Sequence, residues 1–204
     1  PNNRTYPDWD LQVLGECYES VDYLSLHYYH TAPEGNIGAL MNASSVFEDF
    51  INTEIAACDV MQAHFRSPKK MMISFDEWGV ITDTGAVPGG VSQDFGFANF
   101  RQLDAVIYGG RPFRYNDPDR PEAAEPGCYL NSLALTSVLM TLMRHADRVK
   151  IGCMTCGLFV IGHDEEHVWK QAGYHMFEPF IKYASGVSLR PAVEAPVYSV
   201  EGYN

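Results

Sequence analysis

Three short runs of the sequence are apolar without polar alternation, and they constrain the fold more than any other feature. A strand of this kind is typical of a parallel sheet whose two faces are both covered. The runs are residues 21–29 (VDYLSLHYY), 69–78 (KKMMISFDEW) and 148–156 (RVKIGCMTC). Apolar residues recur at helical spacing in residues 44–65, 129–146 and 174–183. Strands and helices therefore alternate along the chain, which predicts an α/β fold with a parallel sheet.

Two segments between the second and third runs are rich in Gly, Pro and polar residues. Residues 79–96 and 109–127 are expected to be loops, and residues 97–108 between them a helix. Long loops in a compact domain are often functional. Ser44 is the expected N-cap of the first helix.

The number of strand–helix units bounds the domain organisation. Three units cannot close an eight-unit barrel, which needs about 250 residues. The chain has 204 residues, begins at Pro1 rather than Met, and changes its pattern after Gly186, where valines are interspersed with prolines. We therefore expect residues 1–186 to be the C-terminal part of a larger (β/α)8 TIM barrel, and residues 187–204 to begin another module.

Charge and cysteine content exclude several classes of partner. The 14 Lys and Arg residues against 26 Asp and Glu residues give a formal charge of −12, the wrong sign for nucleic acid or an anionic membrane. The apolar stretches are too short to span a bilayer. Five cysteines, an odd number, favour reduced thiols and a cytoplasmic location. We expect no nucleic-acid or membrane partner.

The polar residues at the predicted strand ends are the candidates for chemistry, because barrel enzymes work at the C-terminal ends of their strands. Asp76, Glu77 and Trp78 end the second run. Side chains alternate along a strand, so one carboxylate is expected in the barrel mouth and the other in the scaffold. A carboxylate beside an aromatic wall suits sugar chemistry. The alternative is a strand that simply ends in solvent-facing charges.

Three ordered motifs carry a family resemblance. The stretches VDYLSLHYYH, KKMMISFDEWGV and LMRHADRVKIGC resemble glycoside hydrolase family 51, the α-L-arabinofuranosidases of clan A. The resemblance extends from about residue 6 to residue 186. It implies a retaining hydrolase on a (β/α)8 barrel followed by a C-terminal β-sandwich, with the three runs as about strands 6 to 8. No cofactor or metal is implied.

The resemblance also implies roles for individual residues. Glu77 of the F-D-E-W motif matches the nucleophile, and Asp76 a supporting residue behind it. His27 and Tyr29 of the S-L-H-x-Y motif match residues that line the sugar site, with the Tyr29 hydroxyl on the nucleophile. Trp78 would form part of the pocket wall. The family's acid/base Glu follows an Asn, and no Asn-Glu dipeptide occurs in this chain. An N-terminal half that supplies it is expected.

Several positions depart from the family pattern. Gly79 stands where the family usually has Asn, and Cys156 and Phe159 stand where it has a Gln and an Asn near the sugar. Cys156 is still expected to face the pocket. Hydroxyl recognition depends on paired polar groups, so another furanoside or a β-glycan remains an alternative substrate. A carbohydrate-binding remnant without the acid/base is the alternative to an enzyme. A homo-oligomer is expected.

Two further features have alternative explanations. Trp169 is a candidate sugar platform, with core packing as the alternative. His163 and His167 match H-x-x-E-H, a zinc-peptidase pattern, but Gly162 precedes them and no long apolar helix surrounds them. We therefore expect no metal there, although either histidine could line the substrate site.

Overall fold

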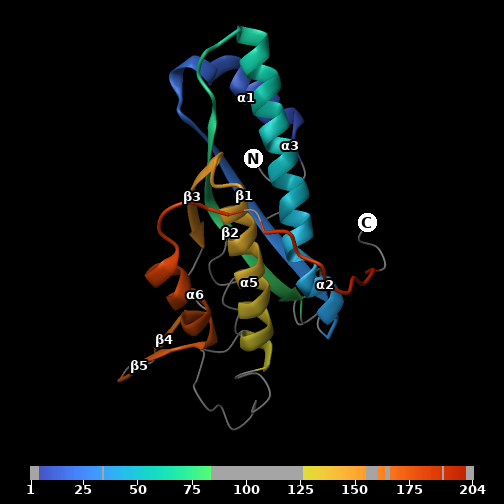
Figure 1. Cartoon of the computed structure of the whole chain (residues 1–204), viewed down its shortest axis with the longest axis vertical. Helices are drawn as coiled ribbons and strands as arrows, with labels where there is room; N and C mark the ends of the chain where they lie inside the picture. Colours follow the sequence, from blue (N-terminus) through green and yellow to red (C-terminus); the bar gives the residue numbers. More distant parts are fainter. Residues whose placement is uncertain are drawn as a thin grey trace.

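The computed structural model describes residues 5–33, 35–83, 126–154, 160–163, 166–189 and 191–200. The centre of the described part is a three-stranded parallel sheet in the order β1-β2-β3 (Figure 1). The strands are β1 (Tyr23–Pro33), β2 (Met72–Asp83) and β3 (Val149–Met154). The three predicted strands and their parallel arrangement are thereby confirmed.

Helices account for most of the remaining described residues. They are α1 (Asp8–Cys17), the 3-10 turn η1 (Tyr18–Ser20), α2 (Ile37–Met41), α3 (Ala43–Phe65), α5 (Pro126–Arg144) and α6 (Ala172–Tyr183). A separate antiparallel hairpin follows β3, formed by β4 (Ile161–His163) and β5 (Val168–Lys170). The three helices expected at 44–65, 129–146 and 174–183 are confirmed.

Several predicted boundaries were wrong. The first two strands continue to Pro33 and Asp83, so the residues expected at their C-terminal ends lie within the strands instead. The reason is that the two chains keep pairing beyond Tyr29 and Gly79, where β-branched residues favour strand. Ser44 lies inside α3 and is not its N-cap, and α5 begins within the expected loop 109–127. The helix expected at 97–108 lies outside the described residues.

Aromatic side chains pack between the sheet and α3. Phe47 and Phe50 of α3 are buried against Phe75 of β2, with ring centroids 5.5 and 5.9 Å apart. Both also contact Tyr28 of β1. Burying each such ring contributes about 1.5–3 kcal/mol. This face of the sheet is therefore the structural one, and the catalytic candidates must be sought on the other.

A buried arginine fixes the N-terminal ends of two strands. The Arg148 guanidinium donates to the Met71 carbonyl from Nε at 3.2 Å and from a terminal nitrogen at 3.1 Å, and to Asp59 Oδ1 at 2.7 Å. Asp59 belongs to α3, so the start of β3, the start of β2 and α3 are joined at one point. This contact ties β2 and β3 to α3 at their N-terminal ends.

Residues 187–189 and 191–200 run from α6 across the end of α5 towards α2 (Figure 1). The Ser188 hydroxyl donates to the Met143 carbonyl at 2.7 Å, and side-chain atoms of Tyr198 and Val200 approach Gly38 of α2. The assignment of 187–204 to a β-sandwich, and the boundary at residue 186, stay predictions. Within the described ranges, no helix is long and apolar enough to cross a membrane.

Candidate active site

A β-bulge in β2 shapes the candidate site. Ser25 pairs with Ser74 and His27 with Glu77, so three steps along β2 match two along β1. The pairing of β2 with β3 shifts at the same place, between Phe75 and Trp78. An extra residue in one strand disturbs the alternation of its side chains. Phe75 and Trp78 are both fully buried, which leaves Asp76 and Glu77 together on the opposite, open face.

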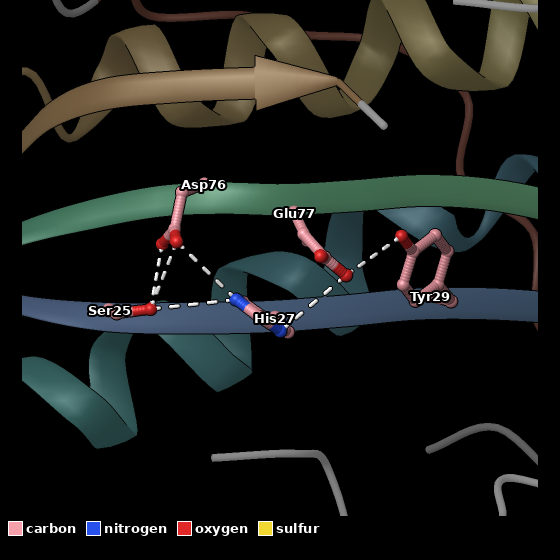
Figure 2. Close-up of polar contacts among 5 residues, drawn as sticks. All are labelled: Ser25, His27, Tyr29, Asp76 and Glu77. Atoms are coloured by element: carbon pink, nitrogen blue, oxygen red, sulfur yellow. Dashed lines mark hydrogen bonds and ion pairs between the residues drawn. The ribbon is translucent and has the colours of Figure 1, made fainter. Parts of the chain in front are cut away.

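This arrangement corrects the expectation that the two carboxylates point to opposite sides. Asp76 and Glu77 both project from β2 towards β1, and His27 lies between them (Figure 2). Their side chains are 40% and 33% exposed, and that of His27 is 37% exposed. Without the bulge, strand alternation would have turned one of the two carboxyl groups into the aromatic core.

Asp76 is held by two side chains of β1. The Ser25 hydroxyl lies 2.9 Å from Oδ1 and 3.1 Å from Oδ2 of Asp76 and donates to them. His27 Nε2 lies 3.4 Å from Asp76 Oδ2 and 3.5 Å from the Ser25 hydroxyl. Partial burial acts to raise the pKa of Asp76, but hydrogen bonds from Ser25, its own backbone and His27 outweigh it and lower the pKa below its usual value. Asp76 is therefore an ionised acceptor at neutral pH.

Glu77 is contacted by two side chains of β1, of which His27 is shared with Asp76. The Tyr29 hydroxyl donates to Glu77 Oε2 at 3.2 Å, and His27 Nδ1 lies 3.5 Å from the same oxygen (Figure 2). The hydrogen bond expected between Tyr29 and Glu77 is therefore present. Residues two apart on a strand share a face, which is why Ser25, His27 and Tyr29 meet the two carboxylates together.

Trp78 does not join this cluster. It is fully buried on the helix-covered face, with its ring 6.4 Å from that of Phe177 in α6 and 6.4 Å from that of Phe47 in α3. The expectation that Trp78 forms the wall of a sugar pocket therefore disagrees with its placement. The physical reason is again the bulge in β2. Because of it, the side chain of Trp78 lies on the same face of the sheet as that of Phe75.

The remaining candidates lie on or beyond β3. Cys156 and Phe159 lie outside the described residues. Trp169 is half-buried in β5 of the hairpin, and its role as a sugar platform stays a prediction. His163 ends the strand β4, so the H-x-x-E-H segment does not place its first histidine on a helix. Within the described ranges, no group of three His, Cys, Asp or Glu side chains is arranged to hold a metal ion.

Ser25 is the member of the cluster that the sequence analysis missed. It stands two residues before His27 in the S-L-H-x-Y motif, so strand alternation alone puts the two side chains on one face. That period-two signal was available in the sequence, but a serine in an apolar run was not singled out as functional.

The curated proteins that resemble this chain include several arabinofuranosidases. The chain is 31% identical over 199 residues to an intracellular exo-α-(1→5)-L-arabinofuranosidase of Acetivibrio thermocellus, covering 95% of this chain and 36% of that protein. It is 28% identical to an enzyme of the same name from Bacillus subtilis, covering 98% and 36%. The chain thus spans about a third of the length of these relatives.

Solved structures agree on the fold. A family 51 α-L-arabinofuranosidase from Bifidobacterium longum superposes with a TM-score of 0.69 at 21% identity, over 98% of this chain and 37% of that one. An α-L-arabinofuranosidase from Thermotoga maritima, solved with arabinose, gives a TM-score of 0.56 at 18% identity, over 90% and 30%. The protein-family model of the α-L-arabinofuranosidase C-terminal domain matches residues 76–204, more than half of the chain. The chain therefore belongs to the α-L-arabinofuranosidase C-terminal domain family.

Proposed function

We propose that this chain carries the catalytic nucleophile of a retaining α-L-arabinofuranosidase. The observation that carries the proposal is the position of Glu77, whose carboxylate lies on the open face of the sheet between Tyr29 and His27. A carboxylate oriented by two neighbouring groups is the arrangement that a glycosidase nucleophile needs. The family membership supports the same chemistry.

The mechanism follows from what these residues can do. Glu77 attacks the anomeric carbon of the sugar and forms a glycosyl-enzyme ester while the leaving oxygen takes a proton from a second carboxylic acid. In a retaining enzyme that acid lies about 5–5.5 Å from the nucleophile and afterwards activates water. We assign it to a part of the protein outside this chain. The Tyr29 hydroxyl holds Glu77 Oε2 in place and keeps the carboxylate turned towards the substrate.

The names of the relatives suggest the substrate and the location. We propose terminal α-L-arabinofuranosyl units of plant cell-wall polysaccharides or oligosaccharides as the substrate, and an intracellular site of action. Cys156 and Phe159 replace polar residues that the family uses near the sugar, so recognition of at least one sugar hydroxyl should differ. The proposed homo-oligomer is a separate claim that sedimentation of the full-length protein would test.

The experiment that tests the proposal replaces the nucleophile in the full-length protein. Glu77→Gly should lower the hydrolysis of 4-nitrophenyl α-L-arabinofuranoside by at least about a thousandfold. Added azide or formate fits the space left by the carboxylate, so it should restore part of the rate and give a product of inverted configuration. Glu16→Gln, at an exposed position of α1, serves as the control and should hydrolyse at the wild-type rate.

Two results would contradict the proposal. Hydrolysis by Glu77→Gly at a near wild-type rate would remove Glu77 from the mechanism. Binding of arabino-oligosaccharides by the wild-type protein without turnover would replace the enzyme with a carbohydrate-binding protein.

A further inference from the structure

We propose that Ser25 and Asp76 are positioning residues that act on Glu77 only through His27. The inference rests on the proposed function, since it concerns how the nucleophile is held. Ser25 and Asp76 contact each other and His27, whereas Glu77 receives its contacts from His27 and Tyr29 (Figure 2). His27 thus links Ser25 and Asp76, called the outer pair below, to the nucleophile Glu77.

The hydrogen-bond donors and acceptors around His27 decide which way its ring is turned. Asp76 is ionised and accepts only, and the single Ser25 hydroxyl proton points at Asp76. A proton must therefore lie on His27 Nε2, which faces both of these oxygens. Nδ1 is then the ring nitrogen that faces Glu77 Oε2, at 3.5 Å.

Ser25 and Asp76 are needed because, among the described residues, they are the groups besides Glu77 that contact the His27 ring. Its side chain is 37% exposed on an open face, where an imidazole is free to turn about its side-chain bonds. A turned ring would withdraw Nδ1 from Glu77 and leave Oε2 to Tyr29 alone. The outer pair therefore acts as the second support of the nucleophile, independent of the one that Tyr29 provides.

A double-mutant cycle in the full-length protein separates this role from a general structural one. Ser25→Ala should lower kcat for 4-nitrophenyl α-L-arabinofuranoside by about tenfold, with KM changed by less than about twofold, because a charge-assisted hydrogen bond is lost. In a His27→Ala background the same change should have almost no effect, since its target is gone. Asp76→Asn should behave in the same way. Ser25→Thr keeps the hydroxyl and should recover most of kcat.

The matched control is Ser74→Ala. Ser74 pairs with Ser25 in the β1–β2 register, but the contacts described for Asp76 and His27 do not involve it, so kcat of Ser74→Ala should equal that of the wild type. An equal loss from Ser25→Ala in both backgrounds, or a raised KM with an unchanged kcat, would overturn the inference. In that case Ser25 would act on the fold or on the substrate directly.

A second measurement does not depend on turnover. Nitrogen-15 NMR shifts of the His27 ring, assigned by comparison with His27→Gln, should show a protonated Nε2 in the wild type and loss of that preference in Asp76→Asn. An unprotonated Nε2 in the wild-type protein would overturn the inference. Absence of arabinofuranoside hydrolysis in the wild type would instead overturn the proposed function, and the NMR result would still decide the role of Asp76.

Discussion

Among the described residues, two pairs of carboxyl groups lie in opposite surroundings. Asp76 and Glu77 lie on an open face, where Ser25, His27 and Tyr29 contact them. Asp10 of α1 and Glu54 of α3 are fully buried, and among the described residues no other group donates a hydrogen bond to their four oxygens. Burial raises the pKa of both buried groups, and with the Asp10 charge it raises that of Glu54 to about 8.

The comparison teaches that the donors around a carboxyl group decide its charge more than burial alone. Partial burial also acts to raise the pKa of Asp76, yet three hydrogen bonds reverse its effect. Glu54 lacks such donors and is therefore held neutral at pH 7. A nucleophile must be reached by its substrate, and of these two pairs only Asp76 and Glu77 lie on an open face. The buried pair is a cost to stability that depends on pH.

The largest expected effect is therefore on stability, from Glu54→Gln. With a folded-state pKa raised to about 8 from 4.5, the contribution of Glu54 to stability is greatest below about pH 4.5 and is lost as the pH rises through 8. Gln carries no charge to bury, so the variant should gain on the order of 2–3 kcal/mol at pH 7 and almost nothing at pH 4. Chemical denaturation of the full-length protein at both pH values measures this. An equal difference at the two pH values would mean that Glu54 is ionised in the fold.

Removing a hydrogen-bond donor to Glu77, on the open face, is expected to have the next largest effect. Tyr29→Phe deletes the hydroxyl that donates to Glu77 Oε2 at 3.2 Å, and kcat for the aryl arabinofuranoside should fall about tenfold. Tyr23→Phe, at the exposed start of β1, is the control and should leave kcat unchanged. An unchanged kcat in Tyr29→Phe would show that His27 alone is enough to orient the nucleophile.

A fifth carboxyl group, that of Glu48, should change stability with pH in the opposite direction to Glu54. Glu48 of α3 accepts hydrogen bonds from Arg144 at 2.9 Å and His145 at 2.8 Å, and these outweigh partial burial and lower its pKa. Its stabilisation is present above the unfolded pKa, near 4.5, and is lost as the pH falls through the lower folded value. Glu48→Gln should therefore lose about 1 kcal/mol at pH 7 and little at pH 3.

The control for Glu48 is its neighbour Asp49, which is exposed. Asp49→Asn should change the free energy of unfolding by less than about 0.5 kcal/mol at either pH. A gain in stability from Glu48→Gln at pH 7 would show that partial burial, rather than the hydrogen bonds from Arg144 and His145, decides the charge of Glu48.

The sequence predicted the elements of this fold well, because continuous apolar runs and helical periodicity are local signals. The three strands, their parallel order and three of the helices follow from them. The family resemblance carried by the S-L-H-x-Y and F-D-E-W motifs also placed His27, Tyr29 and Glu77 in one site. Spacing along the strand encodes only that His27 and Tyr29 share a face, whereas the register that pairs His27 with Glu77 does not follow from it.

The bulge in β2 could not be predicted in the same way. It depends on how β2 pairs with β1 and β3 at once, and nothing local in S-F-D-E-W marks the extra residue. Strict alternation therefore placed Asp76 and Glu77 on opposite faces, and the family resemblance placed Trp78 in the wall of the sugar pocket. The buried Asp10–Glu54 pair was missed for a similar reason, since it forms only when α1 packs on α3.

The smallest expected effect tests whether close packing of the Tyr29 ring against Gly79 supports its hydrogen bond to Glu77. Gly79 pairs with Tyr29 across the strands, and a Cβ at this position would lie 3.2 Å from two carbons of the Tyr29 ring. The ring would have to move by a few tenths of an ångström, which would lengthen its hydrogen bond to Glu77.

Gly79→Ala should therefore lower kcat by about two- to threefold. In a Tyr29→Phe background the ring can shift without losing a hydrogen bond, so the same substitution should change kcat by less than about 1.5-fold. Gly15→Ala is the matched control, because a Cβ there meets only Met61 at an ordinary 3.8 Å. If Gly79→Ala lowers kcat equally in both backgrounds, Gly79 acts on the substrate or on β2 rather than on Tyr29. Glu77 would then owe its position to the strand itself.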